Sequence, residues 1–185
     1  RRVLFRSTLN QIATILIGTV GLLMLNLWWR RRQDSAYGFF ALSALVWAVQ
    51  STNLYVLEPP LPTAAWEILV NASFQVFAGL LLISMLRYVR AEWTPLNLWL
   101  WGTVLISPPA MAFAGPQYFL HVTAVLHMAT LVGASGSLVL LFRSAWRDRN
   151  KDARLLLASM GMIVLFAGHD WLLHSKHLWF NQDLP

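Results

Sequence analysis

The chain alternates between long apolar runs and short clusters of charged residues and prolines. Six of these runs are apolar on every face, whereas a soluble amphipathic helix keeps one polar face. A membrane-spanning helix needs about 20 mostly apolar residues. The pattern therefore predicts an all-α fold, a polytopic membrane bundle of about six helices. We place the spans at 8–29, 35–57, 65–89, 96–114, 117–142 and 155–174.

The fourth predicted span is the least regular of the six, because it contains Pro108 and Pro109. Each proline removes a backbone hydrogen-bond donor and crowds the preceding turn of a helix. Inside a membrane, the backbone groups freed in this way must find partners within the protein. We therefore expect this helix to kink or break at the two prolines.

Lysine and arginine are distributed unevenly over the two ends of the predicted spans. Ten of the 14 lie where spans one, three and five end and where spans two, four and six begin. Because cytoplasmic loops carry the excess of lysine and arginine, this pattern places the three basic loops in the cytoplasm and the N-terminus outside it. Arg1, Arg2 and Arg6 oppose this orientation. We discount them because the chain begins without methionine and looks cut from a longer protein.

The composition fits a protein that lies almost entirely in the bilayer. Hydrophobic residues make up 57% of the 185 positions and charged residues 12%, against about 25% charged in soluble domains. No length remains for a soluble catalytic or DNA-binding domain, so the net charge of +6 and the ten tryptophans indicate basic flanks and aromatic belts. We expect no nucleic-acid partner. Cysteine is absent, which excludes disulfides and thiolate metal sites.

Polar side chains inside the spans are the most informative about function, because a charge at mid-span costs about 2.5–3.5 kcal/mol on insertion scales. In the predicted topology these residues gather in the outer halves of four helices, with Asn26 the main exception. The simplest packing places them around a polar pocket that opens to the outside. They are Gln50 and Asn53 in the second span, Glu67, Asn71, Gln75 and Gly79 at four-residue steps in the third, His121 and His127 in the fifth, and His169, Asp170 and His174 in the sixth.

Each of these residues also has a purely structural interpretation. The amides of the second and third spans can serve only to join helices by hydrogen bonds, at about 0.6 kcal/mol each, and this is the more common role. His121 shares a face with the small residues Ala129, Gly133 and Ser137, so we expect it to be buried against another helix.

The pair His169 and Asp170 lies only about a turn from the end of an otherwise apolar span. Such an aspartate needs a hydrogen-bond donor from a neighbouring helix. The pair can serve as a functional switch or as a buried structural pair, and the sequence favours neither role over the other. Asp170, His174 and His177 have ligand types and helical spacing that suit a metal ion, although a metal site is the weaker interpretation. His121 or Glu67, from another helix, would complete it.

Several short sequence motifs occur within the predicted spans or at their ends. They are Gly18-Thr-Val-Gly21 and Asn26 in the first, Asp34-Ser-Ala-Tyr37, Trp47 and Asn53 in the second, Arg87-Tyr88 at the end of the third, and Gly168-His169-Asp170 in the sixth. In these motifs the chain resembles the membrane module of the bacterial seven-transmembrane receptors with diverse intracellular signalling modules. The resemblance implies a seventh span, an extracytoplasmic domain and a cytoplasmic output domain beyond the ends of this chain.

The function that the resemblance implies is that of a sensor in the bacterial cytoplasmic (inner) membrane. It would relay an extracytoplasmic stimulus to a cytoplasmic output domain, such as a histidine kinase or a diguanylate cyclase. In such a sensor, a polar network inside the bundle would switch between two packings of the helices. We expect this network to include Gln50, Asn53, Asn71, Gln75 and His121, together with His169 and Asp170. We expect no catalytic residue and no cofactor in it. The expected partners are the lipid bilayer, the signalling domain and a small ligand from outside, and a second copy of the chain is a further candidate.

Two other classes of function stay open as alternatives. An intramembrane metal-dependent hydrolase would hold zinc with histidine and aspartate at the outer helix ends and activate a water molecule. A transporter or channel would need a polar site near the midplane and broken helices. Because the polar groups are predicted off-centre, we rank the transporter last.

Overall fold

The computed structural model describes residues 2–56, 58–91, 93–147, 149–162 and 164–165. They form a bundle of α-helices, and no β-strand occurs among these residues, which confirms the predicted all-α fold. A further helix occupies 151–162. The elements before it are α1 (Arg2–Arg30), α2 (Ser35–Ser51), the 3₁₀ turn η1 (Thr52–Leu54), α3 (Thr63–Tyr88), α4 (Thr94–Phe113) and α5 (Gly115–Arg147).

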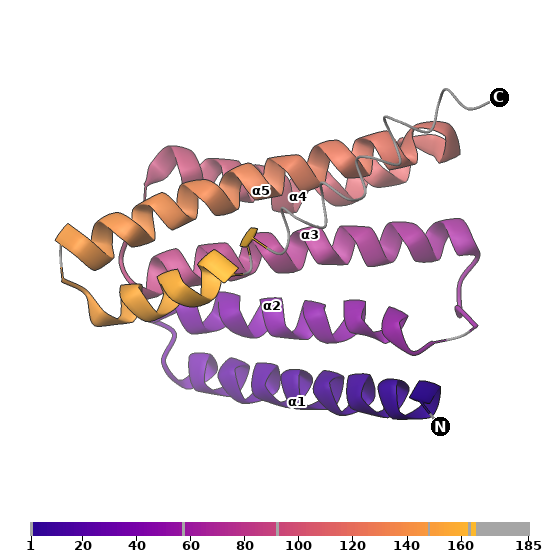
Figure 1. Cartoon of the computed structure of the whole chain (residues 1–185), viewed down its shortest axis with the longest axis horizontal. Coiled ribbons are helices and arrows are strands. Elements are labelled where there is room, and N and C mark those ends of the chain that lie inside the picture. The colour runs from indigo at the N-terminus through magenta and orange to yellow at the C-terminus, as the bar shows by residue number, and fades with distance from the viewer. Residues whose placement is uncertain (1, 57, 92, 148, 163, 166–185) are drawn as a thin grey trace.

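The helices lie side by side, and each runs in the direction opposite to the one before it (Figure 1). α1 packs against α2 at one edge, whereas α3 occupies the middle and contacts α2, α4 and α5. α1, α3 and α5 therefore end at the same end of the bundle, where Arg30, Arg87 and Arg147 lie in their last turns. We call this the basic end. The predicted grouping of the basic loops is confirmed.

Among the described residues, four helices are long and apolar enough to cross a membrane by their length and composition. They are Asn10–Arg30 within α1 and the whole of α3, α4 and α5. α2 has only 17 residues. It ends at Ser51 and passes into η1, so the prediction of a continuous second span to residue 57 is wrong. The predicted sixth span, 155–174, lies partly outside the described residues.

α4 passes through Pro108 and Pro109 without a break and ends at Phe113, so the prediction of a break is wrong. Proline fixes φ at a value that an α-helix accepts, and its costs are the lost hydrogen bonds and the crowding of the preceding turn. Here the cost is confined to the last turns, and packing holds the segment in place, since Ser107 and Met111 are buried on either side. Gly115, with a φ of 68°, then allows the sharp turn into α5.

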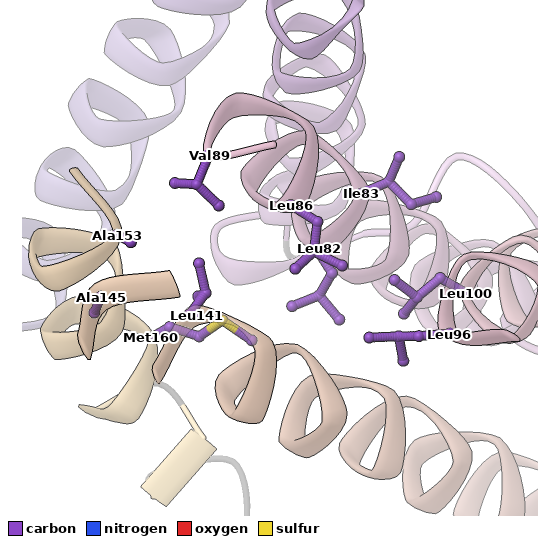
Figure 2. Close-up of a cluster of buried hydrophobic side chains, with 10 residues drawn as sticks. All are labelled: Leu82, Ile83, Leu86, Val89, Leu96, Leu100, Leu141, Ala145, Ala153 and Met160. Carbon is purple, nitrogen blue, oxygen red and sulfur yellow. The ribbon is translucent and has the colours of Figure 1, made fainter. Parts of the chain in front are cut away.

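A cluster of buried apolar side chains closes the basic end (Figure 2). It joins the last turns of α3, the first turns of α4, the last turns of α5 and the helix at 151–162. Its members are Leu82, Ile83, Leu86, Val89, Leu96, Leu100, Leu141, Ala145, Ala153 and Met160. Two stretches that are distant in sequence, 82–100 and 141–160, are therefore packed into one unit, which we call the basic-end cluster.

The helix at 151–162 begins at Asn150, whose side chain caps it. Asn150 Oδ1 accepts hydrogen bonds from the backbone N–H groups of Asp152 at 3.0 Å and Ala153 at 3.2 Å. The N–H groups in the first turn of a helix have no carbonyl partner within the helix, so the side chain of Asn150 satisfies two of them. We expect Asn150→Ala to lower the free energy of unfolding by about 1 kcal/mol and Asn150→Asp to preserve it. Unfolding in mixed micelles with increasing SDS measures this difference, and equal stability of all three proteins would contradict it.

Candidate functional site between α3 and α5

The polar row along α3 winds from the surface into the interior of the bundle. Four residues turn an α-helix by about 400°, so each step moves the direction by about 40°. Accordingly Glu67 is exposed, Asn71 is half-buried, and Gln75 and Gly79 are buried. The side chain of Gln75, near the middle of α3, has no exposed surface at all.

A matching row lies on α5. Thr123, His127 and Thr130 follow one another at steps of four and three residues, which places them on one face of the helix. Thr130 Oγ1 donates a hydrogen bond to Gln75 Oε1, and both residues are buried. Because both lie near the middle of their helices, this bond joins α3 to α5 deep inside the bundle and far from both ends.

An aromatic contact lies beside this hydrogen bond. The ring of Phe74 stacks on the imidazole of His127, with centroids 5.2 Å apart and an interplanar angle of 16°. His127 Nδ1 lies 2.8 Å from the backbone oxygen of Thr123, and because a carbonyl oxygen only accepts, Nδ1 is the donor. We call Phe74, Gln75, His127 and Thr130 the α3–α5 polar cluster.

The amide of Gln75 is only half satisfied. Gln75 Nε2 is buried and has no hydrogen-bond partner among the described residues, and the same holds for Thr123 Oγ1. A buried donor without a partner costs about 1–3 kcal/mol. The packing of α3 on α5 therefore leaves hydrogen-bonding groups of this region unsatisfied.

Among the described residues, the other predicted amides form no hydrogen bond with this cluster. Asn53 is exposed in η1 and accepts a hydrogen bond from Trp66 Nε1 at 2.8 Å, so it joins the end of α2 to the start of α3. Asn71 Nδ2 donates to the backbone oxygen of Glu67 at 2.9 Å, within its own helix. Gln50 is half-buried, and its Oε1 has no partner in the described part of the chain.

His121 is exposed, so the prediction that it is buried is wrong. The prediction followed three steps of four residues from His121 to Gly133. Each step shifts the side-chain direction by about 40°, so the directions of His121 and Gly133 differ by about 120° and the two residues do not share a face. Gly133 is buried against Leu100 and Trp99 of α4, while His121 is exposed.

Four predicted residues, His169, Asp170, His174 and His177, lie outside the described residues. The joint polar network that includes them therefore stays a prediction. Within the described ranges, no group of three histidine, aspartate or glutamate side chains could hold a metal ion. The weaker metal prediction concerned Asp170, His174 and His177, so it also stays untested.

Thr130 is the main residue that the sequence interpretation missed. Buried hydroxyls are common in this bundle, and most of them donate to a carbonyl of their own helix, as Ser137 Oγ does to Gly133 at 2.9 Å. A hydroxyl of this kind is therefore weak evidence for a site. The spacing of Thr130 with His127 and Thr123 would have separated it from the others, because it places all three on one face.

These features define a polytopic helical membrane protein with a polar cluster in its interior. The family model described as 7TM diverse intracellular signalling matches residues 7–182, which is nearly the whole chain. The chain belongs to this family, and the resemblance seen in the sequence motifs is confirmed. No curated protein and no solved structure matches the chain.

Proposed function

We propose that the chain is the membrane sensor module of a bacterial receptor in the cytoplasmic membrane. The basic end faces the cytoplasm in this proposal, as the positive-inside rule favours, and the N-terminus lies outside. A stimulus from outside, either a small ligand or a linked extracytoplasmic domain, changes the packing of the helices. The chain itself performs no chemistry and passes the change to an output domain of histidine kinase or diguanylate cyclase type.

The observation that carries the proposal is the half-satisfied amide of Gln75. A two-state device needs two packings of similar free energy. The present packing satisfies Gln75 Oε1 through Thr130 but leaves Nε2 without a partner among the described residues. A rival packing that satisfies Nε2 would recover the roughly 1–3 kcal/mol that this packing loses. A stimulus would then need only a few kcal/mol of preference to move the equilibrium between the two packings.

A movement of α3 against α5 has a direct route to the basic end. Both helices contribute to the basic-end cluster, which also holds Ala153 and Met160 of the helix at 151–162. The same movement reaches α2 through Arg87, whose Nη1 donates to Ser35 Oγ at 2.8 Å and whose guanidinium lies 4.6 Å from the ring centroid of Phe39. The helices at the cytoplasmic side would thus shift together.

The test uses two substitutions with different expected results. Thr130→Val removes a hydrogen bond that exists in the present packing, so it shifts the basal output of the receptor. A buried interhelical bond of this kind is worth about 0.6–1.7 kcal/mol, which corresponds to a shift of roughly 3- to 20-fold. Gln75→Leu removes the amide from both packings, so it reduces the difference in output with and without stimulus. Kinase or cyclase activity in membranes that contain the native polypeptide measures both effects.

A matched control is Ser135→Ala. Ser135 is an exposed residue of α5 whose hydroxyl donates to its own helix at Leu131, 2.9 Å away, so its loss should leave the output unchanged. If Thr130→Val and Gln75→Leu behave like Ser135→Ala, the proposed role of the α3–α5 polar cluster is wrong. If the native protein that contains this chain has neither kinase nor cyclase activity, the proposed receptor function itself is wrong.

A further inference from the structure

α1 is the edge helix of the bundle, and one of its faces is used for packing. Gly18 and Gly21 let α1 approach α2 closely, since a Cβ on Gly21 would lie 3.1–3.2 Å from side-chain atoms of Leu45 and Ala44. On the same face, Thr14 Oγ1 and Ser51 Oγ are 2.8 Å apart and share a hydrogen bond. The remaining surface of α1 faces outward along the edge of the bundle (Figure 1).

Part of that outward surface has the spacing of a coiled-coil seam. Six exposed residues follow one another at alternating steps of three and four, the arrangement of the two core positions of a heptad repeat. Four of the six are large apolar residues with exposed fractions from 49% to 67%. We call the set the α1 seam, and it consists of Ile12, Ile15, Thr19, Leu22, Asn26 and Trp29.

Apolar residues are expected anywhere on a membrane helix, so the polar members of the α1 seam carry the argument. Between residues 12 and 29, Thr19 and Asn26 are the exposed polar side chains, and they lie seven residues apart at the same heptad position. Thr19 Oγ1 donates to the backbone oxygen of Ile15 at 2.8 Å and is satisfied within its helix. Asn26 makes no side-chain hydrogen bond in the described part of the chain.

An amide that faces lipid without a partner is unfavourable, because lipid tails offer no hydrogen bonds. Asn26 lies one turn before Arg30, about 6 Å inside the basic end of α1. A primary amide has both a donor and an acceptor. The same amide in a second copy of α1, related by a twofold axis, would therefore satisfy both groups at once.

We propose that α1 is a homodimer interface, in which the α1 seams of two copies form a parallel coiled coil and their Asn26 amides bond to each other. Two copies inserted in one membrane have the same orientation, so their heptads come into register without further constraint. A single asparagine at such a core position is known to select a parallel pair and to set its register. This inference does not depend on the proposed sensor function, because it rests on α1 alone.

The absence of cysteine from the chain makes a direct test available. Single cysteines are introduced at Ile15 and Leu22 in the α1 seam and at Val20 and Leu27 as controls. The controls are also exposed, at 41% and 50%, but point well away from the seam. On mild oxidation in native membranes, we expect disulfide-linked dimers several times more abundant at the seam positions. Equal cross-linking at seam and control positions, or none at the seam, overturns the proposal.

A second measurement addresses the amide itself. We expect Asn26→Leu to weaken association in lipid vesicles by about 3- to 20-fold, the range for a hydrogen bond between membrane helices. Asn26→Gln, which keeps an amide, should retain most of the affinity, and Leu27→Ala should leave it unchanged. Energy transfer between labelled copies, followed on dilution into lipid, measures the association. If Asn26→Leu associates as tightly as the unaltered chain, the asparagine pair is wrong.

Discussion

Replacement of Gly79 by valine is expected to disrupt the packing of α3 on α4 and to lower the free energy of unfolding by about 3 kcal/mol or more. A Cβ built on Gly79 would overlap Cγ2 of Val104, which is buried at 7% exposure. A β-branched side chain has one strongly preferred rotamer in a helix, so Val104 cannot turn aside at low cost. The helices must separate instead, and overpacking of this kind exceeds the usual cost of about 1–3 kcal/mol.

The same substitution should reach the candidate site. Gly79 lies one turn from Gln75 on α3, so a separation of α3 from α4 would also move Gln75 relative to Thr130. Unfolding in mixed micelles with increasing SDS measures the stability, and the output of the receptor measures the effect on the site. We expect Gly79→Ala to be milder, and the second substitution Val104→Ala to restore part of the loss, because it removes the atom that blocks the new Cβ.

Gly102 of α4 provides the matched control. Nothing lies within 4 Å of a Cβ built there. Gly102→Ala should therefore be tolerated and should add up to about 1 kcal/mol of helix propensity. If Gly79→Val folds as well as Gly102→Ala, then α3 and α4 do not approach each other at Gly79 as the structure has them.

The second large effect is expected for Leu141→Ala in the basic-end cluster. Leu141 has no exposed surface and packs where α3, α4, α5 and the helix at 151–162 meet (Figure 2). In soluble proteins such a truncation costs about 2–5 kcal/mol. Part of that cost comes from transferring the side chain out of water, and this part is absent in a membrane because lipid tails are as apolar as leucine. The remaining cost comes from the lost packing contacts. We therefore expect a loss of about 2 kcal/mol and a weaker coupling of α3 and α5 to residues 151–162.

Val139→Ala is the control for Leu141→Ala, because Val139 is 66% exposed on the same helix. Its loss should change the free energy of unfolding by less than about 0.5 kcal/mol. The same SDS titration measures both variants. Equal stability of Leu141→Ala and Val139→Ala would mean that the basic-end cluster does not hold the four segments together.

The helical class and most helix positions could be predicted from the sequence. The predicted third span, 65–89, matches α3 at Thr63–Tyr88 within two residues at each end. The grouping of arginines at one end was also predictable. Both results follow from local properties, because the length of an apolar run and the charges that flank it determine whether a segment crosses a bilayer.

The rotation of each helix about its axis could not be predicted in the same way. Lipid-facing and buried positions of a membrane helix are equally apolar, so hydrophobicity does not separate them. Ile15 is 67% exposed and Ile83 is 1% exposed, although the residue type is the same. The error for His121 has a different origin, because four-residue steps were followed as one face although each step shifts the direction by about 40°.

The amino-acid sequence alone predicts a membrane bundle with its basic loops at one end and polar side chains inside several spans. The pairing of Gln75 with Thr130, the link of Asn53 to Trp66 and the outward position of Asn26 become visible in the folded bundle. The physical reason is that a hydrogen bond between helices needs two groups at one depth and on facing sides. Depth can be counted along a chain, but the facing side is set by the packing of all the helices together.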